Sequence, residues 1–247
     1  MVPDQRYIVI DAWLSRCLGK KSCRLNLTEL SSKSDRDELH REIGELKQEP
    51  VFVYAKVPVD MLSATRFLEE VGFHLIDTNI VFDKSRSSDV PLKGTCTIRL
   101  AEPTDQDQVV DLARRSFCYS RFHLDCAISR DIADEIKAQW AKAYFLGERG
   151  NQMVVAQTGG EITGFLQLMT DKEHALVIDL IAVDDRFRGQ GIGADMIRYA
   201  QQQNASCARV RVGTQLANAP SIRFYEKMGF RYLSSSYVFH FHTFPRG

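Results

Sequence analysis

The 247-residue sequence has no excess of charge of either sign and no long apolar run. Its 32 Lys and Arg residues balance 32 Asp and Glu residues, so the chain as a whole does not attract nucleic acid or an anionic membrane surface. No apolar run approaches the ~20 residues of a membrane span, and the first residues lack the basic-then-apolar order of a secretion signal. We therefore expect a cytoplasmic protein that binds neither nucleic acid nor membrane and meets any charged ligand through a local site.

Paired cysteines are also missing. The six cysteines include no Cys-x-x-Cys pair, which argues against both a zinc site and a disulfide framework. We expect them to be reduced and mostly buried, and we expect no metal centre. His240 and His242 alternate along a predicted strand, which places both on one outward face with no third ligand close in sequence.

An internal repeat is the first positive feature. The segment Thr65–Phe82, TRFLEEVGFHLIDTNIVF, aligns with Ile222–Phe239, IRFYEKMGFRYLSSSYVF, at a constant offset of 157 residues. Both segments predict a short helix that ends at a glycine and is followed by a strand. The constant offset indicates duplication, although the same order of elements also occurs in unrelated α/β proteins.

The segment 83–95, rich in Ser, Lys and Asp, has the composition of a linker. We therefore predict an N-terminal domain at 1–85, a linker at 86–95 and a second domain at 96–247. In the second domain the pattern predicts strands at 96–100, 153–157, 162–169, 175–183, 209–213 and 231–242, and helices at 104–116, 131–144, 219–228 and after the glycines at 189–193. Helices that interrupt a larger number of strands indicate a mixed α/β sheet.

Three glycines in five positions, Gly189, Gly191 and Gly193, separate an apolar strand from a helix. Without side chains, successive N–H groups can face one concavity, and the first donors of a helix have no internal partner. Such a site binds an anion, phosphate above all, and Arg186 and Arg188 add positive charge. A Walker motif is excluded because no Gly-Lys-Ser/Thr follows, and a dinucleotide fingerprint lacks the acidic residue on the next strand.

The segment RGQGIG, Arg188 to Gly193, resembles the Arg/Gln-x-x-Gly-x-Gly/Ala signature of the GCN5-related N-acetyltransferases. NAPSIRFYEKMGF resembles the Asn-then-Tyr helix of that family, with Asn218 and Tyr225 in place. The resemblance covers residues 95–247 and implies the acetyltransferase fold there, with a loop for the pyrophosphate of acetyl-coenzyme A. The first half resembles only the end of such a domain. Leu68 and Met61 stand where Tyr225 and Asn218 stand in the second half, so the first half is expected to be a degenerate, truncated copy kept for structure.

A truncated domain joined to a complete one resembles the two-domain dTDP-fucosamine acetyltransferase type within this family. That resemblance implies transfer of an acetyl group to the amine of a nucleotide-linked amino sugar, a dTDP-amino-deoxy sugar, for surface polysaccharide synthesis. It also leaves room for a homodimer. Another amine, in a small molecule, a polyamine or a protein, is the enzymatic alternative. A non-catalytic acyl-coenzyme A-binding module is the other, against which Tyr225 argues.

Acetyl transfer to an amine needs an aligned nucleophile, a donor for the oxyanion and an acid for the thiolate. By resemblance, strand 175–183 diverges from strand 210–213 and offers free N–H groups to the thioester. Tyr225 is the expected general acid, with ring packing as its alternative. Asp179, the only carboxylate in its apolar strand, is open to three roles: base, hydrogen-bond anchor or solvated residue. A water chain is the alternative base.

Two sets of contacts complete the expectations. The residues expected to contact acetyl-coenzyme A are Leu180, Ile181, Ala182, Val183, Arg188, Gly189, Gln190, Gly191, Ile192, Gly193, Ala194 and Asn218. In the loop 119–125, Arg121, Phe122 and His123 are expected to contact the acceptor, because an arginine and an aromatic ring can grip a diphosphate and stack on a base. An ordinary structural loop is the alternative.

Overall fold

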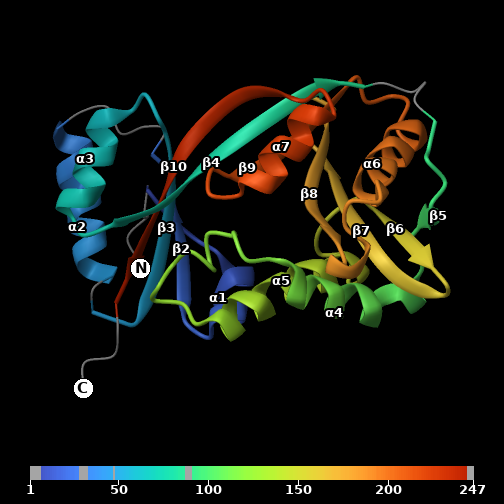
Figure 1. Ribbon diagram of the computed structural model, residues 1–247. Coiled ribbons are helices and arrows are strands. Elements are labelled where there is room, and N and C mark those ends of the chain that lie inside the picture. Colours follow the sequence, from blue (N-terminus) through green and yellow to red (C-terminus); the bar gives the residue numbers. More distant parts are fainter. Residues whose placement is uncertain (1–6, 28–32, 47, 87–90, 244–247) are drawn as a thin grey trace.

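The structure is a computed structural model that describes residues 7–27, 33–46, 48–86 and 91–243. Within these residues one mixed sheet of ten strands runs through the molecule in the order β1-β2-β3-β10-β4-β9-β8-β7-β6-β5 (Figure 1). The expected mixed α/β sheet is confirmed. Among the helices of the described residues, none has the length and apolar content that a membrane span requires.

The first half contributes strands β1 (Ile8–Ile10), β2 (Lys21–Leu25), β3 (Val51–Pro58) and β4 (His74–Ser85) and helices α1 (Ala12–Leu18), α2 (Lys33–Leu46) and α3 (Leu62–Glu70). The second half contributes strands β5 (Thr97–Leu100), β6 (Gln152–Thr158), β7 (Glu161–Thr170), β8 (Leu176–Val183), β9 (Arg209–Gln215) and β10 (Arg231–His242). Its helices are α4 (Gln106–Ser116), α5 (Arg130–Phe145), α6 (Ile192–Gln203) and α7 (Ala219–Lys227), with short 3-10 turns at Pro103–Asp105 and Asp185–Phe187. The elements expected in the second half lie within a few residues of their predicted ends.

Helices cover both faces of the sheet. On one face α5 packs with α1 against Phe52 of β3 and with α4 against Leu180 of β8. On the other face α2 and α3 cover Val53 of β3, and α6 and α7 cover Val212 of β9. Each face of the sheet therefore carries two apolar clusters, one in each half of the molecule, and Figure 1 shows α1, α5 and α4 in a row beneath the sheet.

The two halves exchange their last strands. β10 pairs with β3, β4 pairs with β9, and β4 and β10 lie side by side, all antiparallel (Figure 1). Ser236 pairs with Pro58 and Asn79 pairs with Gln215, so the two registers are related by the offset of 157 residues found in the sequence. Ser236 also pairs with Asn79, which places a local two-fold axis between them. The β3–β10 and β4–β9 pairings are thus related by the same offset as the sequence repeat. The domain boundaries stay a prediction.

A bulge in β8 changes which layer its side chains enter. The register with β7 slips at Asp179, which has no partner on that strand. Ile178 packs under α6 and α7, whereas Leu180, two residues later, packs with α4 and α5. Simple alternation would place both on one face, and the extra residue of a bulge removes that constraint. The bulge therefore sets the direction of Asp179.

The cysteines are free, but the expectation that most are buried is wrong. Only Cys23 and Cys207 are buried, and Cys118 and Cys126 are exposed. The exposed pair lies in the loop between α4 and α5, outside the apolar layers.

Candidate functional site

β8 and β9 separate partway along their length. Their parallel pairing covers Leu176–Ile178 on β8 and Val210–Val212 on β9 and then ends. Beyond this point β8 pairs only with β7, and β9 pairs with β4. The expected divergence of the two strands is present, and we call it the split. Within the described residues, the β9-facing backbone groups of residues 180–183 have no strand partner there.

The glycine-rich loop begins at the open end of the split. Gly189 and Gly191 adopt φ angles of 80° and 91°, left-handed backbone that favours glycine. α6 then begins at Ile192, and its first internal hydrogen bond joins Asp195 N to Gly191 O at 3.0 Å. The N–H groups of the three residues before Asp195 have no acceptor inside the helix. They can therefore bind an anion, as the sequence indicated.

A lysine from the linker lies on this loop, which the sequence analysis missed. A Cβ atom at Gly191 would lie 2.9 Å from Cδ and 3.4 Å from Nζ of Lys93. The backbone N–H of Lys93 donates to Asp195 Oδ2 at 2.8 Å and fixes the linker to the first turn of α6. Its ammonium thus adds a charge beside the anion-binding N–H groups.

The two arginines before the glycines differ in how they are engaged. Arg186 donates to both oxygens of Asp184 and pairs with Glu161, which fastens the loop to β7. These bonds hold the pKa of the Asp184 carboxyl well below its usual value. Arg188 donates to Val183 O at 3.2 Å and pairs with Asp185 at 2.5 Å. The side chains of Arg186 and Arg188 are 59% and 55% exposed, so solvent reaches both.

Tyr225, on α7, packs where the strands separate. Its side chain shares a core cluster with Ile178 and Val212, the last pair before the split, and its ring centroid lies 6.3 Å from that of Phe82 and 5.5 Å from that of Phe230. It is 3% exposed, and burial raises the pKa of the phenol. None of the described residues hydrogen-bonds to its hydroxyl. The hydroxyl is thus a protonated donor without an acceptor, and its acid role stays a prediction.

Asn218 caps the helix that carries Tyr225. Its side-chain oxygen accepts from Ser221 N at 3.2 Å. Met61, its counterpart in the first half, makes no such bond at the start of α3, and Leu68, the counterpart of Tyr225, is fully buried. The first half therefore has a helix equivalent to α7, but it lacks the capping amide and the phenol at the two matching positions. Contact of Asn218 with the coenzyme stays a prediction.

Asp179 is held by several donors. Arg149 donates to both carboxylate oxygens at 2.7 Å, Trp140 Nε1 donates at 2.8 Å and Gln167 Nε2 donates at 3.2 Å. Three of these donors converge on Oδ2 and one on Oδ1, and together they fix the orientation of the carboxylate. Among the three roles left open, the geometry favours the anchor, which places Arg149 and Trp140 beside the split.

Four cationic side chains gather on the α5 face of the sheet, and we call them the cationic cluster: Lys56, Arg121, Lys137 and Arg149. They come from both halves of the chain, and the two arginines lie close enough to each lysine to disfavour its charge. Desolvation lowers the pKa of Lys56 to about 8, although its side chain is exposed. Its Nζ lies 3.4 Å from Asn79 Oδ1.

Lys137 is the most buried member of the cluster. Its residue is 8% exposed, and its ammonium lies 5.0 Å from the ring centroid of Phe117 and 4.5 Å from that of Trp140. Desolvation lowers its pKa to about 7, an effect that the charge of Asp179 opposes and the other cations reinforce. Within the described residues, the ammonium has no hydrogen-bond or ion-pair partner.

The three residues expected to contact the acceptor have different surroundings. Arg121 stacks on Tyr54, with Cζ 3.8 Å from the ring centroid, and belongs to the cationic cluster. Phe122 is 1% exposed and packs in the core under α5. His123 hydrogen-bonds to Asp134 at 2.8 Å, and its side chain is 4% exposed. Contact of Phe122 and His123 with an acceptor stays a prediction, and their burial favours the structural alternative.

Asp125, His240 and His242 place one potential ligand atom each within 4.8 Å of one another. The two histidines do not face outward as alternation suggested, because His240 is fully buried. Each histidine hydrogen-bonds to Asp125 Oδ2, His240 through Nδ1 at 2.6 Å and His242 through Nε2 at 2.8 Å. Burial lowers the pKa of His240 to about 4. Arg121 lies 3.3 Å from His240 Nε2 and Lys20 lies 3.4 Å from His242 Nδ1. Two flanking cations favour a hydrogen-bonded network over a metal site.

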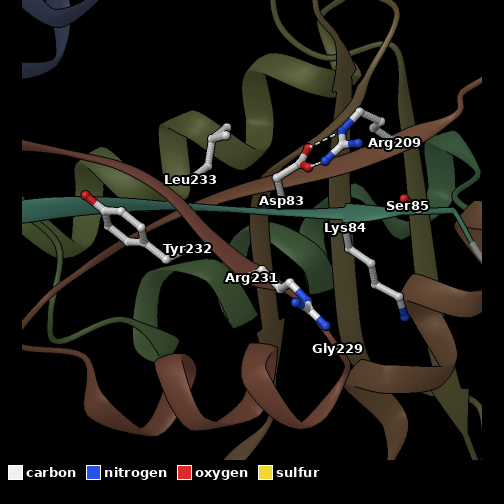
Figure 2. Close-up of a pocket in the computed structure, with 8 residues that line it drawn as sticks. All are labelled: Asp83, Lys84, Ser85, Arg209, Gly229, Arg231, Tyr232 and Leu233. Atoms are coloured by element: carbon white, nitrogen blue, oxygen red, sulfur yellow. Dashed lines mark hydrogen bonds and ion pairs between the residues drawn. The ribbon is translucent and has the colours of Figure 1, made fainter.

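A separate pocket of about 390 Å³ lies where β4, β9 and β10 meet (Figure 2). Its lining residues are Asp83, Lys84, Ser85, Arg209, Gly229, Arg231, Tyr232 and Leu233. Asp83 forms an ion pair with Arg209, as Figure 2 shows, and Lys84 Nζ donates to Met228 O at 2.6 Å. The pocket contains none of the residues predicted for acetyl transfer.

Comparison with known proteins identifies the second half. Residues 108–230 match the acetyltransferase (GNAT) family. The spore coat polysaccharide biosynthesis protein SpsD of Bacillus subtilis is 28% identical over 92% of this chain and 80% of that protein. Human N-acetylaspartate synthetase is 31% identical over 47% of this chain and only 37% of its own length. A tandem GNAT protein from the clavulanic acid biosynthesis pathway shares the fold, with a TM-score of 0.62 and 14% identity over 92% of this chain and 76% of that one.

Proposed function

Since residues 108–230 form a domain of the acetyltransferase (GNAT) family, the protein is an acetyl-coenzyme A-dependent N-acetyltransferase, and we propose that its acceptor is the amine of a nucleotide-linked amino sugar. The likeness to SpsD, whose name places it in polysaccharide biosynthesis, supports this acceptor because it extends over both halves of the chain. We also propose a cytoplasmic location, since all six cysteines are free and two are exposed, which suits a reducing compartment.

The residues at the split fit the coenzyme. The left-handed glycines and the unpaired N–H groups of the loop form an anion site that Lys93 and Arg188 supplement, and this site suits a pyrophosphate. The free edge of β8 at residues 180–183 suits the amides of a pantetheine arm. The coenzyme supplies the acetyl group as a thioester.

The proposed roles of the chain follow from this placement. A backbone N–H of residues 180–183 polarises the carbonyl that the amine attacks, a contribution of about 3 kcal/mol for one such donor in other enzymes. The carbon–sulfur bond then breaks, and the Tyr225 hydroxyl donates its proton to the sulfur. The amine loses its proton to solvent water, since the Asp179 oxygens are engaged by Arg149, Trp140 and Gln167.

A second candidate acceptor is an amine that carries a carboxylate, such as an amino acid. The name of the human relative, N-acetylaspartate synthetase, describes such a reaction for that protein. The cationic cluster favours an acidic acceptor of this kind as well.

The observation that carries the proposed activity is the split, with Tyr225 in the core cluster of the last strand pair and the anion-binding loop at its open end. A thiol-release assay with acetyl-coenzyme A tests it on a panel that contains a dTDP-amino-deoxy sugar, aspartate, a polyamine and a peptide with a free N-terminus. The proposal expects the highest kcat/KM with the nucleotide sugar. Release that is faster with aspartate would favour the second candidate, and release above background with none of them would contradict both.

A further inference from the structure

We infer that the acceptor carries an anionic group, and that Lys56 of the first half and Lys137 of the second half bind this group together beside the split. The inference rests on the proposed acetyl transfer and adds the chemical class and the binding site of the acceptor. It also gives the first half a direct part in the active site, in addition to its role as a scaffold.

The position of the two lysines follows from the strand pairing. The last pair before the split is Ile178 with Val212. On the β8 side the next residue is Asp179, which holds Trp140, and Lys137 lies over the ring of that tryptophan. Lys137 therefore belongs to one margin of the split.

The other margin is built from β9 and from the exchanged strand. After Val212, β9 continues with Gly213, which lies beside Asn79 of β4: a Cβ atom on Gly213 would contact Asn79 Nδ2 at 3.4 Å. Asn79 Nδ2 donates to Thr214 O at 3.0 Å, and its Oδ1 lies 3.4 Å from Lys56 Nζ. Lys56 and Lys137 thus approach the split from opposite margins on the same face of the sheet.

The charges around the two lysines are not balanced by the chain. The nearby carboxylates already have other partners. Asp179 accepts hydrogen bonds from Arg149, Asp125 hydrogen-bonds to His240, and Asp11 accepts from the Tyr54 hydroxyl at 2.9 Å. Within the described residues, neither lysine has a carboxylate partner. For Lys137, a largely buried ammonium without a carboxylate partner is costly, and the cost is recovered when an anion binds.

The exposure of the two side chains suits a bound ligand. Lys137 is more than nine-tenths buried, which strengthens any charge-assisted hydrogen bond that it makes, while Lys56 is accessible and can admit a ligand. Phosphate and carboxylate groups share the required chemistry. The diphosphate of a nucleotide sugar and the carboxylate of an amino acid are the two sources to be distinguished.

The test measures anion binding without turnover. Calorimetry is performed on the full chain saturated with coenzyme A, which occupies the glycine loop, and the two probes are inorganic pyrophosphate and succinate. We expect one probe to bind, and we expect Lys56→Met and Lys137→Met each to weaken its binding by about 10- to 100-fold, the value of one charge-assisted hydrogen bond. Lys137→Arg, which keeps the charge, should restore part of the affinity, and Lys172→Met at an exposed site is the matched control.

The outcomes separate the inference from the proposed function. Binding of pyrophosphate assigns the site to a phosphoanhydride, and binding of succinate assigns it to a carboxylate. Absence of binding by both probes, or equal binding by wild type and the two methionine variants in their folded state, would overturn the inference. If anions bind as expected while no amine in the panel releases thiol, the anion site stands and the proposed function fails. If an uncharged amino sugar reacts as well as its phosphorylated form, the proposed acetyl transfer stands and the anion site fails.

Discussion

Replacement of Lys137 by methionine should stabilise the protein, and more strongly in acid than in base. Methionine keeps the length of the apolar stem among Phe117 and Trp140 and removes the ammonium of a residue that is 8% exposed. Within the described residues this ammonium has no ion-pair partner. Desolvation, partly opposed by Asp179, lowers the pKa of Lys137 from 10.5 to about 7. The folded state therefore disfavours the charge that the unfolded chain carries.

The sign of the pH dependence follows from this difference. Below pH 7 both states hold the proton, and the folded state bears the full cost of the buried charge. Between about pH 7 and pH 10.5 the folded protein releases the proton while the unfolded chain keeps it, so the cost diminishes as the pH rises. One pKa unit corresponds to about 1.4 kcal/mol, so the shift corresponds to roughly 5 kcal/mol at most. Relaxation around the ammonium reduces this gain, and we expect at least about 2 kcal/mol at pH 6.

Thermal unfolding followed by circular dichroism provides the measurement. For a chain of this length about 2 kcal/mol corresponds to about 4–8 °C in Tm. Lys137→Met should exceed wild type by that amount at pH 6, and the difference should narrow at pH 9.5, whereas Lys172→Met should match wild type at both pH values. A difference independent of pH, or a lower Tm at pH 6, would show that the ammonium is solvated or paired and would refute the reasoning.

Three further predictions concern the coenzyme site and the scaffold. Tyr225→Phe should lower kcat by ~10² to 10⁴ with unchanged coenzyme A affinity, because it removes only the proton donor; near wild-type kcat would leave Tyr225 as a packing residue. Lys93→Ala should weaken coenzyme A binding by about 3- to 10-fold in calorimetry, and equal affinity would place Lys93 outside the anion site. Leu68→Ala should lower the free energy of unfolding by about 2–5 kcal/mol in denaturant titrations, because Leu68 is fully buried; lost turnover with an unaltered unfolding curve would contradict its scaffold role.

Features set by neighbouring residues could be predicted from the sequence. The left-handed glycines of the loop, the start of α6 after Gly191 and the helix that carries Tyr225 depend on residues only a few positions apart. The divergence of β8 from β9 came from the family resemblance, and its pairing pattern is as expected. The same resemblance could not decide the role of Asp179, because its donors Arg149, Trp140 and Gln167 lie on other elements.

The remaining features depend on contacts between distant segments. Lys56 and Lys137 meet only because β4 and β10 are exchanged, and no local pattern signals the exchange. The balanced total charge also conceals the cationic cluster, since a sum over the chain carries no information about position. His240 was misplaced for a similar reason: alternation predicts which residues share a face, but not whether Phe52 and α5 cover that face.

The exchange of β4 and β10 also constrains when the protein can complete its fold during synthesis. β3 obtains its second neighbour only from β10, which is synthesised after every other described strand, because Val53 pairs with Phe241, far along the sequence. Until then β3 keeps an open edge, and open edges recruit other strands. Contacts so distant in sequence form slowly and late. A nascent chain stalled before Arg231 should therefore remain sensitive to proteases and to aggregation however long it is held, and release of β10 should be the event that completes the pairing of β3.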